Sequence, residues 1–191
     1  MSSGVSLIDR HTDATQKLIL ASALELLEQS SVNELTVRAV AKFAGMSERT
    51  VFRYYASRDD FLDAVAGEVV RSLQVPAPPS TIEELLTFPR VLYARYEAKA
   101  GLVKSALHTE LFKRMRDSIA NERWQAVRLL IAAYAPHRSE YDRKIAVANI
   151  SYYLTATAWH YYRFNFGFAL EEAVSSVESA VKLAVDDLAR Q

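Results

Sequence analysis

Apolar residues recur along this chain at the three- and four-residue spacing of amphipathic α-helices. One short stripe, at i, i+3, i+4 and i+7, consists of Val37, Val40, Ala41 and Ala44. Another, in the stretch 170–189, consists of Val174, Val177, Val181 and Val185. Beyond residue 80 there is no alternating run rich in Val and Ile and no hairpin dipeptide. The pattern predicts an all-α protein.

Breaker residues divide the helical pattern into about nine segments. The predicted helices cover about 14–29, 36–44, 48–55, 57–75, 80–101, 102–107, 109–133, 140–164 and 170–189. The strongest breaker is the proline-rich segment 75–80, because proline cannot continue a helix. We therefore expect two domains, residues 1–75 and 76–191. Pro89 is expected to kink or split the fifth helix.

The stretch 36–55 has the features of two short helices joined by a tight turn. Gly45 can adopt the left-handed conformation that ends a helix, and Ser47 can cap the next helix. In that second helix Val51 and Tyr55 share a face and can pack on the first. Four residues are left facing outward: Arg49, Thr50, Phe52 and Arg53. A small helix of this kind suits the DNA major groove, so we predict a helix-turn-helix.

This stretch resembles the DNA-binding domain of the TetR family of transcriptional regulators. The resemblance is carried by Leu35-Thr36, Arg38, Val40-Ala41, Ala44-Gly45-Met46-Ser47, Thr50-Val51-Phe52-Arg53-Tyr54-Tyr55, Ser57-Arg58 and Phe61-Leu62. With the preceding helix it covers roughly the first third of the chain, and a string of this order and spacing is specific. It implies a three-helix DNA-binding domain followed by a helical domain for effector binding and dimerisation.

The charge of the chain is balanced overall but not locally. The formal net charge is zero, so no global field points to nucleic acid. Between Thr36 and Arg58, however, five basic residues face Glu48 alone. They are Arg38, Lys42, Arg49, Arg53 and Arg58. Such a local excess attracts phosphates, although a solvated basic face would be the simpler interpretation without the helix-turn-helix pattern.

Residues of the predicted second helix are candidates for contacts with DNA bases. Arg49 and Arg53 stand one helical turn apart, and an arginine can bind both acceptors of a guanine edge. We expect base contact from at least one of the two, with a backbone contact alone as the simpler alternative. Thr50 can bond to a base or place its methyl group against that of thymine. Tyr55 is assigned to the core.

Other residues suit the DNA backbone, where contacts set the register of the protein without specifying sequence. Ser47, Tyr54 and Arg58 are phosphate candidates. The resemblance adds Thr36 and Arg38 to the backbone contacts, and it leaves Phe52 open between the core and a contact with DNA.

The stretch from Ile145 to Leu170 is crowded with aromatic residues, and Arg163 is its only charged residue apart from His160. Its aromatic residues are Tyr152, Tyr153, Trp159, Tyr161, Tyr162, Phe164, Phe166 and Phe168. A helix that is apolar nearly all round is buried on more than one side. The resemblance implies a homodimer in which residues 140–164 and 170–189 pair with their symmetry mates.

The sharper interpretation of the aromatic residues is an effector pocket, and core plus dimer interface is the simpler one. The candidate lining residues, chosen from helix faces, are Tyr93, Tyr96, Phe112, Met115, Trp124, Tyr153 and His160. Because no acidic residue lies between Ile145 and Leu170, we expect a small-molecule effector that is apolar or aromatic and neutral or anionic.

The sequence offers no pattern for catalysis or for metal binding. It has no cysteine, no Gly-rich phosphate loop and no Gly-x-Ser-x-Gly motif. Its four histidines are scattered without metal-ligand spacing. We expect no catalytic residue, no metal and no cofactor. The N-terminal residues lack the pattern of a signal peptide, and no apolar run reaches membrane-spanning length, so a cytoplasmic protein without a membrane partner is expected.

These features predict a dimeric transcriptional regulator that binds a near-palindromic operator in double-stranded DNA. The expected role is that of a repressor that a small molecule releases. One alternative is an architectural or accessory DNA-binding protein of the same fold without an effector. Another is a small-molecule-binding or catalytic helical protein whose helix-turn-helix is vestigial.

Overall fold

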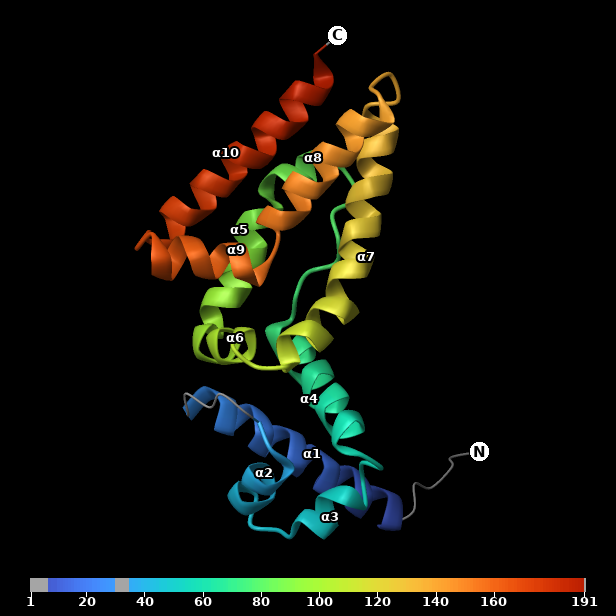
Figure 1. Ribbon diagram of the computed structural model, residues 1–191, viewed down its shortest axis with the longest axis vertical. Coiled ribbons are helices and arrows are strands. Elements are labelled where there is room, and N and C mark those ends of the chain that lie inside the picture. Colours follow the sequence, from blue (N-terminus) through green and yellow to red (C-terminus); the bar gives the residue numbers. More distant parts are fainter. Residues whose placement is uncertain (1–6, 30–34, 191) are drawn as a thin grey trace.

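The regular elements of this chain are helices throughout the part that the structure describes (Figure 1). The computed structural model describes residues 7–29 and 35–190, without the side chains of residues 7–13 and 117–120. The elements are α1 (Leu7–Gln29), α2 (Val37–Phe43), α3 (Glu48–Phe52), α4 (Arg58–Leu73), α5 (Ile82–Ala98), α6 (Ala100–Leu107), α7 (Leu111–Tyr134), α8 (Glu140–Tyr153), α9 (Ala156–His160), the π-helical turn η1 (Tyr161–Asn165) and α10 (Leu170–Ala189). The predicted all-α class is confirmed.

Hydroxyl caps determine where several helices begin. Thr36, Ser47 and Ser57 accept backbone N–H groups at the starts of α2, α3 and α4, and the cap at Ser47 is the one predicted above. At α5 the cap is Thr81 rather than Ser80, and its hydroxyl accepts the N–H of Glu84 at 3.2 Å. The Glu84 carboxylate in turn accepts the N–H of Ser80 at 2.7 Å, which further fixes the start of α5.

Several predicted helix boundaries were wrong. Helix α1 begins at Leu7, ahead of the predicted start near residue 14. Helix α3 ends at Phe52 instead of Tyr55, because the chain tightens into a turn after one and a half turns of helix. Pro89 was expected to kink or split the fifth helix, but α5 continues past it to Ala98, so Pro89 does not split the helix; its side chain is buried. Helix α5 ends at Ala98 and α6 begins at Ala100, ahead of the predicted junction at Gly101.

The predicted long helix 140–164 is also wrong, because it is broken after Tyr153. Thr155 caps a new helix, α9, by accepting the N–H of Ala158 at 3.1 Å. The helical path then widens into η1 and ends near Gly167, whose φ of +73° suits glycine. This break gives the described part of the chain ten α-helices instead of about nine.

Helices α1 to α4 lie at the lower end of the view in Figure 1, and α5 to α10 lie above them. The segment after α4 carries the chain from the lower group to the upper one. Within the lower group, α1 packs on α2 and α4. Between the two groups, α4 packs on α7 and α1 packs on α6. One cluster of buried apolar residues therefore runs through both groups. Contacts between the two groups offer a physical route by which one can influence the other.

Candidate nucleic-acid interface and adjoining cavity

The turn before α3 sets the direction of that helix. Gly45 has a φ of +68°, and the N–H of Met46 donates to the carbonyl of Ala41 at 2.9 Å. Ser47 then accepts the N–H of Thr50 at 3.2 Å, and the two hydroxyl oxygens lie 2.9 Å apart. The inner face of α3 is held by Val51, which is fully buried. The helix is short, but its cap and its apolar edge fix its orientation.

The turn that follows α3 is anchored in the core and on α1. Tyr55 is buried and meets Phe61 edge to face, with ring centroids 5.5 Å apart. Its neighbour Tyr54 receives a hydrogen bond from Arg53 at 3.4 Å. Hydrogen bonds with Thr15 of α1 and with Arg53 lower the pKa of Tyr54. The assignment of Tyr55 to the core agrees with the structure.

Basic and aromatic side chains remain on the outside of α2 and α3. Arg38, Arg49 and Arg53 are exposed, and Phe52 is 44 % exposed. Arg53 lies over the ring of Tyr54, with its guanidinium carbon 5.5 Å from the ring centroid. An exposed phenylalanine between two exposed arginines has no role in the core of this chain. The surface presents groups that can contact both bases and phosphates.

Arg58 makes a contact that the sequence did not predict. At the start of α4 it donates to both carboxylate oxygens of Glu110, one of them at 3.0 Å. One turn into α7, Arg114 donates to Asp59 at 2.6 Å and also to Asp63. These carboxylates raise the pKa of Arg114. The charged end of α4 is therefore tied to the start of α7 by ion pairs between residues more than fifty positions apart.

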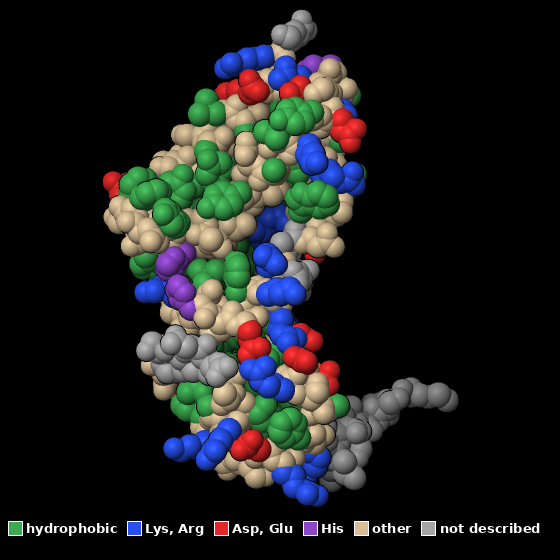
Figure 2. All heavy atoms as spheres, viewed as in Figure 1, with side chains coloured by type: hydrophobic (Ala, Val, Ile, Leu, Met, Phe, Trp, Pro, Cys, Tyr) green, Lys and Arg blue, Asp and Glu red, His purple; other side chains and the backbone are tan. Residues whose placement is uncertain are grey.

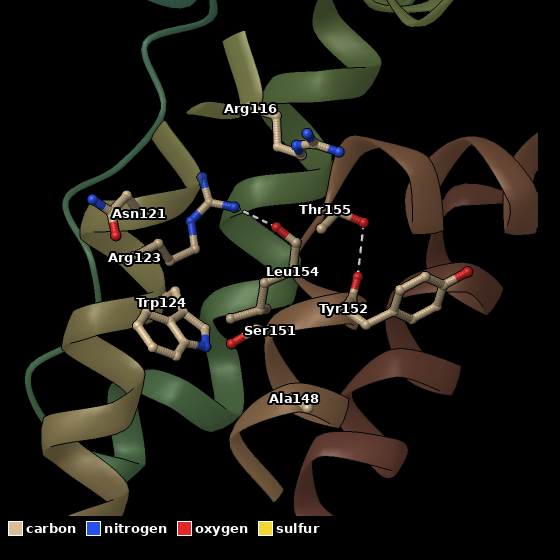
Figure 3. A pocket seen from close by; sticks show the side chains of 9 residues that line it. All are labelled: Arg116, Asn121, Arg123, Trp124, Ala148, Ser151, Tyr152, Leu154 and Thr155. Carbon is tan, nitrogen blue, oxygen red and sulfur yellow. Dashed lines mark hydrogen bonds between the residues drawn. The ribbon is translucent and has the colours of Figure 1, made fainter. Parts of the chain in front are cut away.

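A cavity in two adjoining parts lies above α4, between helices of the upper group. The two parts share four lining residues: Arg116, Arg123, Tyr152 and Thr155. The apolar part, of about 330 Å³, lies among α4, α5, α6, α7 and the junction of α8 with α9. It is lined by Leu73, Tyr96, Val103, Ala106, Leu107, Phe112, Met115, Arg116, Arg123, Tyr152, Thr155, Ala156 and Thr157. A more open part of about 600 Å³ lies between α7 and α8 (Figure 3). It is lined by Arg116, Asn121, Arg123, Trp124, Ala148, Ser151, Tyr152, Leu154 and Thr155.

Four of the seven predicted pocket residues line this cavity. Tyr96, Phe112 and Met115 line its apolar part, and Trp124 lines its open part.

The other three predicted pocket residues are not among the lining residues. Tyr93 is fully buried and donates to the carbonyl of Tyr153 at 2.8 Å, and burial raises the pKa of the Tyr93 hydroxyl. His160 packs against Phe164 and His108, with ring centroids 5.2 Å and 5.6 Å apart, and burial lowers its pKa. The side chains of Tyr93 and His160 therefore make contacts between helical segments rather than lining the cavity.

Sequence reasoning missed the two arginines of the cavity, Arg116 and Arg123, which line both of its parts. Arg123 is only 7 % exposed and donates to the carbonyl of Leu154. Its guanidinium carbon lies 5.9 Å from the ring centroid of Phe88. No local signal could have revealed this, since α7 carries many exposed charges and the partners of Arg123 lie more than thirty residues away.

Comparison with known proteins decides the family. The family model of the bacterial regulatory proteins of the tetR family matches residues 19–65, from α1 into α4. Residues 19–65 form a DNA-binding domain of the TetR family. This match identifies a DNA-binding regulator rather than an enzyme, and the predicted helix-turn-helix is confirmed.

Two solved structures share the fold of this chain. Mycobacterium smegmatis BioQ is 20 % identical, with a TM-score of 0.54 over 90 % of this chain and 95 % of that one. BioQ with its natural double-stranded DNA operator is 19 % identical, with a TM-score of 0.51 over 92 % of this chain and 98 % of that one. No curated protein matches the sequence. Within the described residues no helix is both long and apolar enough to span a bilayer.

Proposed function

We propose that this TetR-family regulator is a repressor that binds a near-palindromic operator as a homodimer and leaves it when a small molecule binds. The observation that carries the proposal is the outer surface of α3. Arg49, Phe52 and Arg53 are exposed there, although Val51 and Tyr55 of the same segment are buried. A helix fixed on one side and polar on the other can enter a major groove without unfolding.

The proposed contacts divide into base readers and backbone contacts. Arg49, Thr50 and Arg53 are assigned to base edges, with Phe52 beside them against the DNA. The backbone set is Thr36, Arg38, Ser47, Tyr54 and Arg58. Thr36 caps α2, and a helix N-terminus favours a phosphate nearby. That BioQ is known with a double-stranded operator on the same fold supports duplex DNA as the partner.

The dimer is proposed to form through α8 and α10, which pack on each other. Helix α8 carries Tyr141, Ile145 and Tyr152 along one exposed face, 72 %, 45 % and 55 % exposed. Leu183 of α10 is 65 % exposed. A row of large exposed apolar side chains on neighbouring helices is typical of a surface that a second protein covers. Two copies would place their α3 helices in successive major grooves, about 34–36 Å apart or a multiple of that spacing.

The cavity is the proposed effector site. Leu73, at the C-terminal end of α4, lines the cavity. The N-terminal end of α4 follows α3, the proposed recognition helix. A ligand that favours one position of α4 would alter the separation of the two α3 helices. It can act only through its different affinity for the two arrangements. The cavity favours this function over that of an accessory protein without an effector. Such a repressor acts in the cytoplasm.

A selection experiment tests this function. Full-length protein is incubated with fragmented genomic DNA from its source, and bound fragments are sequenced after washing with unrelated competitor DNA. We expect enrichment of a few fragments that share an inverted repeat, each bound by two chains. Recovery of fragments without a shared motif would contradict sequence-specific regulation. If specific binding is found but no small molecule weakens it, the accessory protein is the better description.

A further inference from the structure

The proposed effector cavity contains a buried cation, Arg123, whose described partners are neutral. Arg123 is almost fully buried, and the contacts of its guanidinium group in the described part of the chain are with the Leu154 carbonyl and the Phe88 ring. A buried charge is costly unless an opposite charge compensates it. A carbonyl and an aromatic ring compensate only in part. The guanidinium group therefore offers a favourable position for an anion.

The neighbouring groups favour an anion over a cation. Arg116 lines both parts of the cavity with Arg123, and none of the described lining residues is Asp or Glu. Figure 2 shows a Lys or Arg side chain at the back of a hollow in the middle of the molecule. A cationic ligand would meet the guanidinium groups of Arg116 and Arg123 and no carboxylate among the described lining residues.

Ser151 is a second polar residue of the cavity. Its hydroxyl oxygen is buried and forms no hydrogen bond with the described residues. Ser151 lines the same open part of the cavity as Arg123, from the opposite helix (Figure 3). Buried hydroxyl groups are normally hydrogen-bonded. An anionic group between α7 and α8 could accept from Ser151 and from Arg123 together.

The remaining walls suit an apolar body. Beyond the arginines the smaller part is lined mostly by aliphatic and aromatic side chains, among them Tyr96, Phe112 and Met115. Its volume of about 330 Å³ falls within the range of small-molecule sites. Since Arg123 lines both parts, a ligand can bind its charge in one and extend its apolar chain into the other.

We propose that the effector is an amphipathic organic carboxylate, with its carboxylate on Arg123 and Ser151 and its apolar body among Tyr96, Phe112 and Met115. This inference rests on the proposed function, because it names the class of ligand for the same cavity. The carboxylate forms an ion pair with Arg123. Arg123 then has a negatively charged partner in addition to the Leu154 carbonyl. Leu154 lies at the break between α8 and α9. A ligand that binds Arg123 can therefore alter the position of α8, the proposed dimer helix.

Calorimetric titration of the full-length protein tests the proposal. The probes are octanoate, decanoate and dodecanoate, each compared at neutral pH with the primary alcohol and the primary amine of equal length. We expect the preferred carboxylate to bind at least about tenfold more tightly than its alcohol, since hydrogen bonds to charged groups are the stronger ones. The amine is expected to bind most weakly.

Variants of the cavity residues test whether Arg123 binds the carboxylate. Arg123→Gln is expected to lower carboxylate affinity to that of the alcohol while alcohol affinity stays unchanged, which shows that the cavity is intact. Arg123→Lys is expected to keep part of the preference, and Ser151→Ala to weaken carboxylate binding alone. Arg128→Gln is the matched control, because Arg128 is exposed on the same helix and does not line the cavity. If Arg123→Gln does not fold, the Lys and Ala variants decide.

Three results would overturn the proposal: no binding by any carboxylate of the series, equal binding of carboxylate and alcohol, or an undiminished carboxylate preference in Arg123→Gln. Release of operator DNA is measured separately by fluorescence anisotropy. A carboxylate that binds but leaves the DNA complex intact would contradict the proposed repressor mechanism while the ligand class stands. Release by neutral compounds alone would contradict the ligand class and leave the repressor standing.

Discussion

Arg58 and Glu110 form an ion pair that joins the first residue of α4 to the residue before α7. Arg58 is also a proposed phosphate contact, so the same guanidinium group has two possible anionic partners. Both side chains are more than a third exposed, and exposed pairs are worth little on their own. Glu110 and a DNA phosphate would compete for the guanidinium group of Arg58, because that group can bind only one of them fully.

Removal of the Glu110 charge tests this competition. We expect Glu110→Gln to tighten operator binding by about two- to fivefold, because Arg58 no longer has to leave a carboxylate. The dependence of binding on salt should steepen if Arg58 then contacts phosphate more fully. Glu122→Gln, which removes an exposed charge on α7, is the control. Weaker binding by Glu110→Gln would show instead that the pair holds α4 in the position that DNA requires.

Base recognition by α3 is tested with the Arg49→Ala, Arg53→Ala double variant. Each bidentate arginine contributes about 1–3 kcal/mol of discrimination between bases. We expect the double variant to lose most of its preference for operator over unrelated DNA, whereas Lys42→Ala weakens both complexes alike. Competition binding assays measure the ratio. An unchanged preference in the double variant would show that these arginines contact only the backbone or are not used.

The proposed dimer surface predicts a change in mass. Ile145→Lys is expected to convert the dimer to monomer, because it introduces a charge into a row of apolar side chains that dimerisation would bury. Light scattering coupled to size-exclusion chromatography measures the mass. Leu129→Lys is the matched control, since Leu129 is 61 % exposed on α7, outside α8 and α10. Loss of the dimer in both variants, or in neither, argues against this surface.

Glu97 links α5 to η1 and gives the fold a dependence on pH. Its carboxylate accepts from Arg163 at 2.6 Å and 2.9 Å and from the indole of Trp159 at 3.1 Å. The hydrogen bonds from Arg163, followed by that from Trp159, lower the pKa of Glu97 despite its partial burial. A group with a depressed pKa stabilises the fold above its unfolded pKa and loses this contribution as the pH falls through the folded value.

Glu97→Gln should therefore be less stable than the parent protein at neutral pH, by about 1–3 kcal/mol. We expect the difference to shrink as the pH is lowered below about 4, the ordinary range of a glutamate. Urea denaturation at several pH values measures both effects. Glu83→Gln serves as the control at an exposed position of α5. A difference that stays constant with pH would exclude ionisation of Glu97 as its source.

Local signals in the sequence were sufficient for the helix-turn-helix. Gly45 ends one helix, Ser47 caps the next, and Val51 with Tyr55 marks the buried edge, so each decision depends on residues within a few positions. The proline segment likewise marks the passage from α4 to α5. Such signals act through short-range hydrogen bonds and steric limits that the sequence displays directly.

The rest of the site depends on contacts between distant segments. The partner of Arg58 is Glu110, and that of Arg123 is the Leu154 carbonyl. Neither is visible in the local pattern. The sequence analysis missed the break at Leu154. The aromatic stretch around it is apolar on every side of a helix, so the spacing of its apolar residues does not show where one helix ends and the next begins. Tyr96, Phe112 and Met115 were found because residues on inner helix faces tend to meet.

Operator binding by the full-length protein tests the central claim most directly. A labelled duplex from the enriched genomic fragments is titrated by fluorescence anisotropy at two salt concentrations, with unrelated duplex as competitor. We expect tight, competitor-resistant binding of two chains per duplex that weakens with salt, by a slope of about 0.9 per phosphate contact. Equal and weak binding of both duplexes, unaffected by the Arg49→Ala, Arg53→Ala substitutions, would contradict sequence-specific binding through α3.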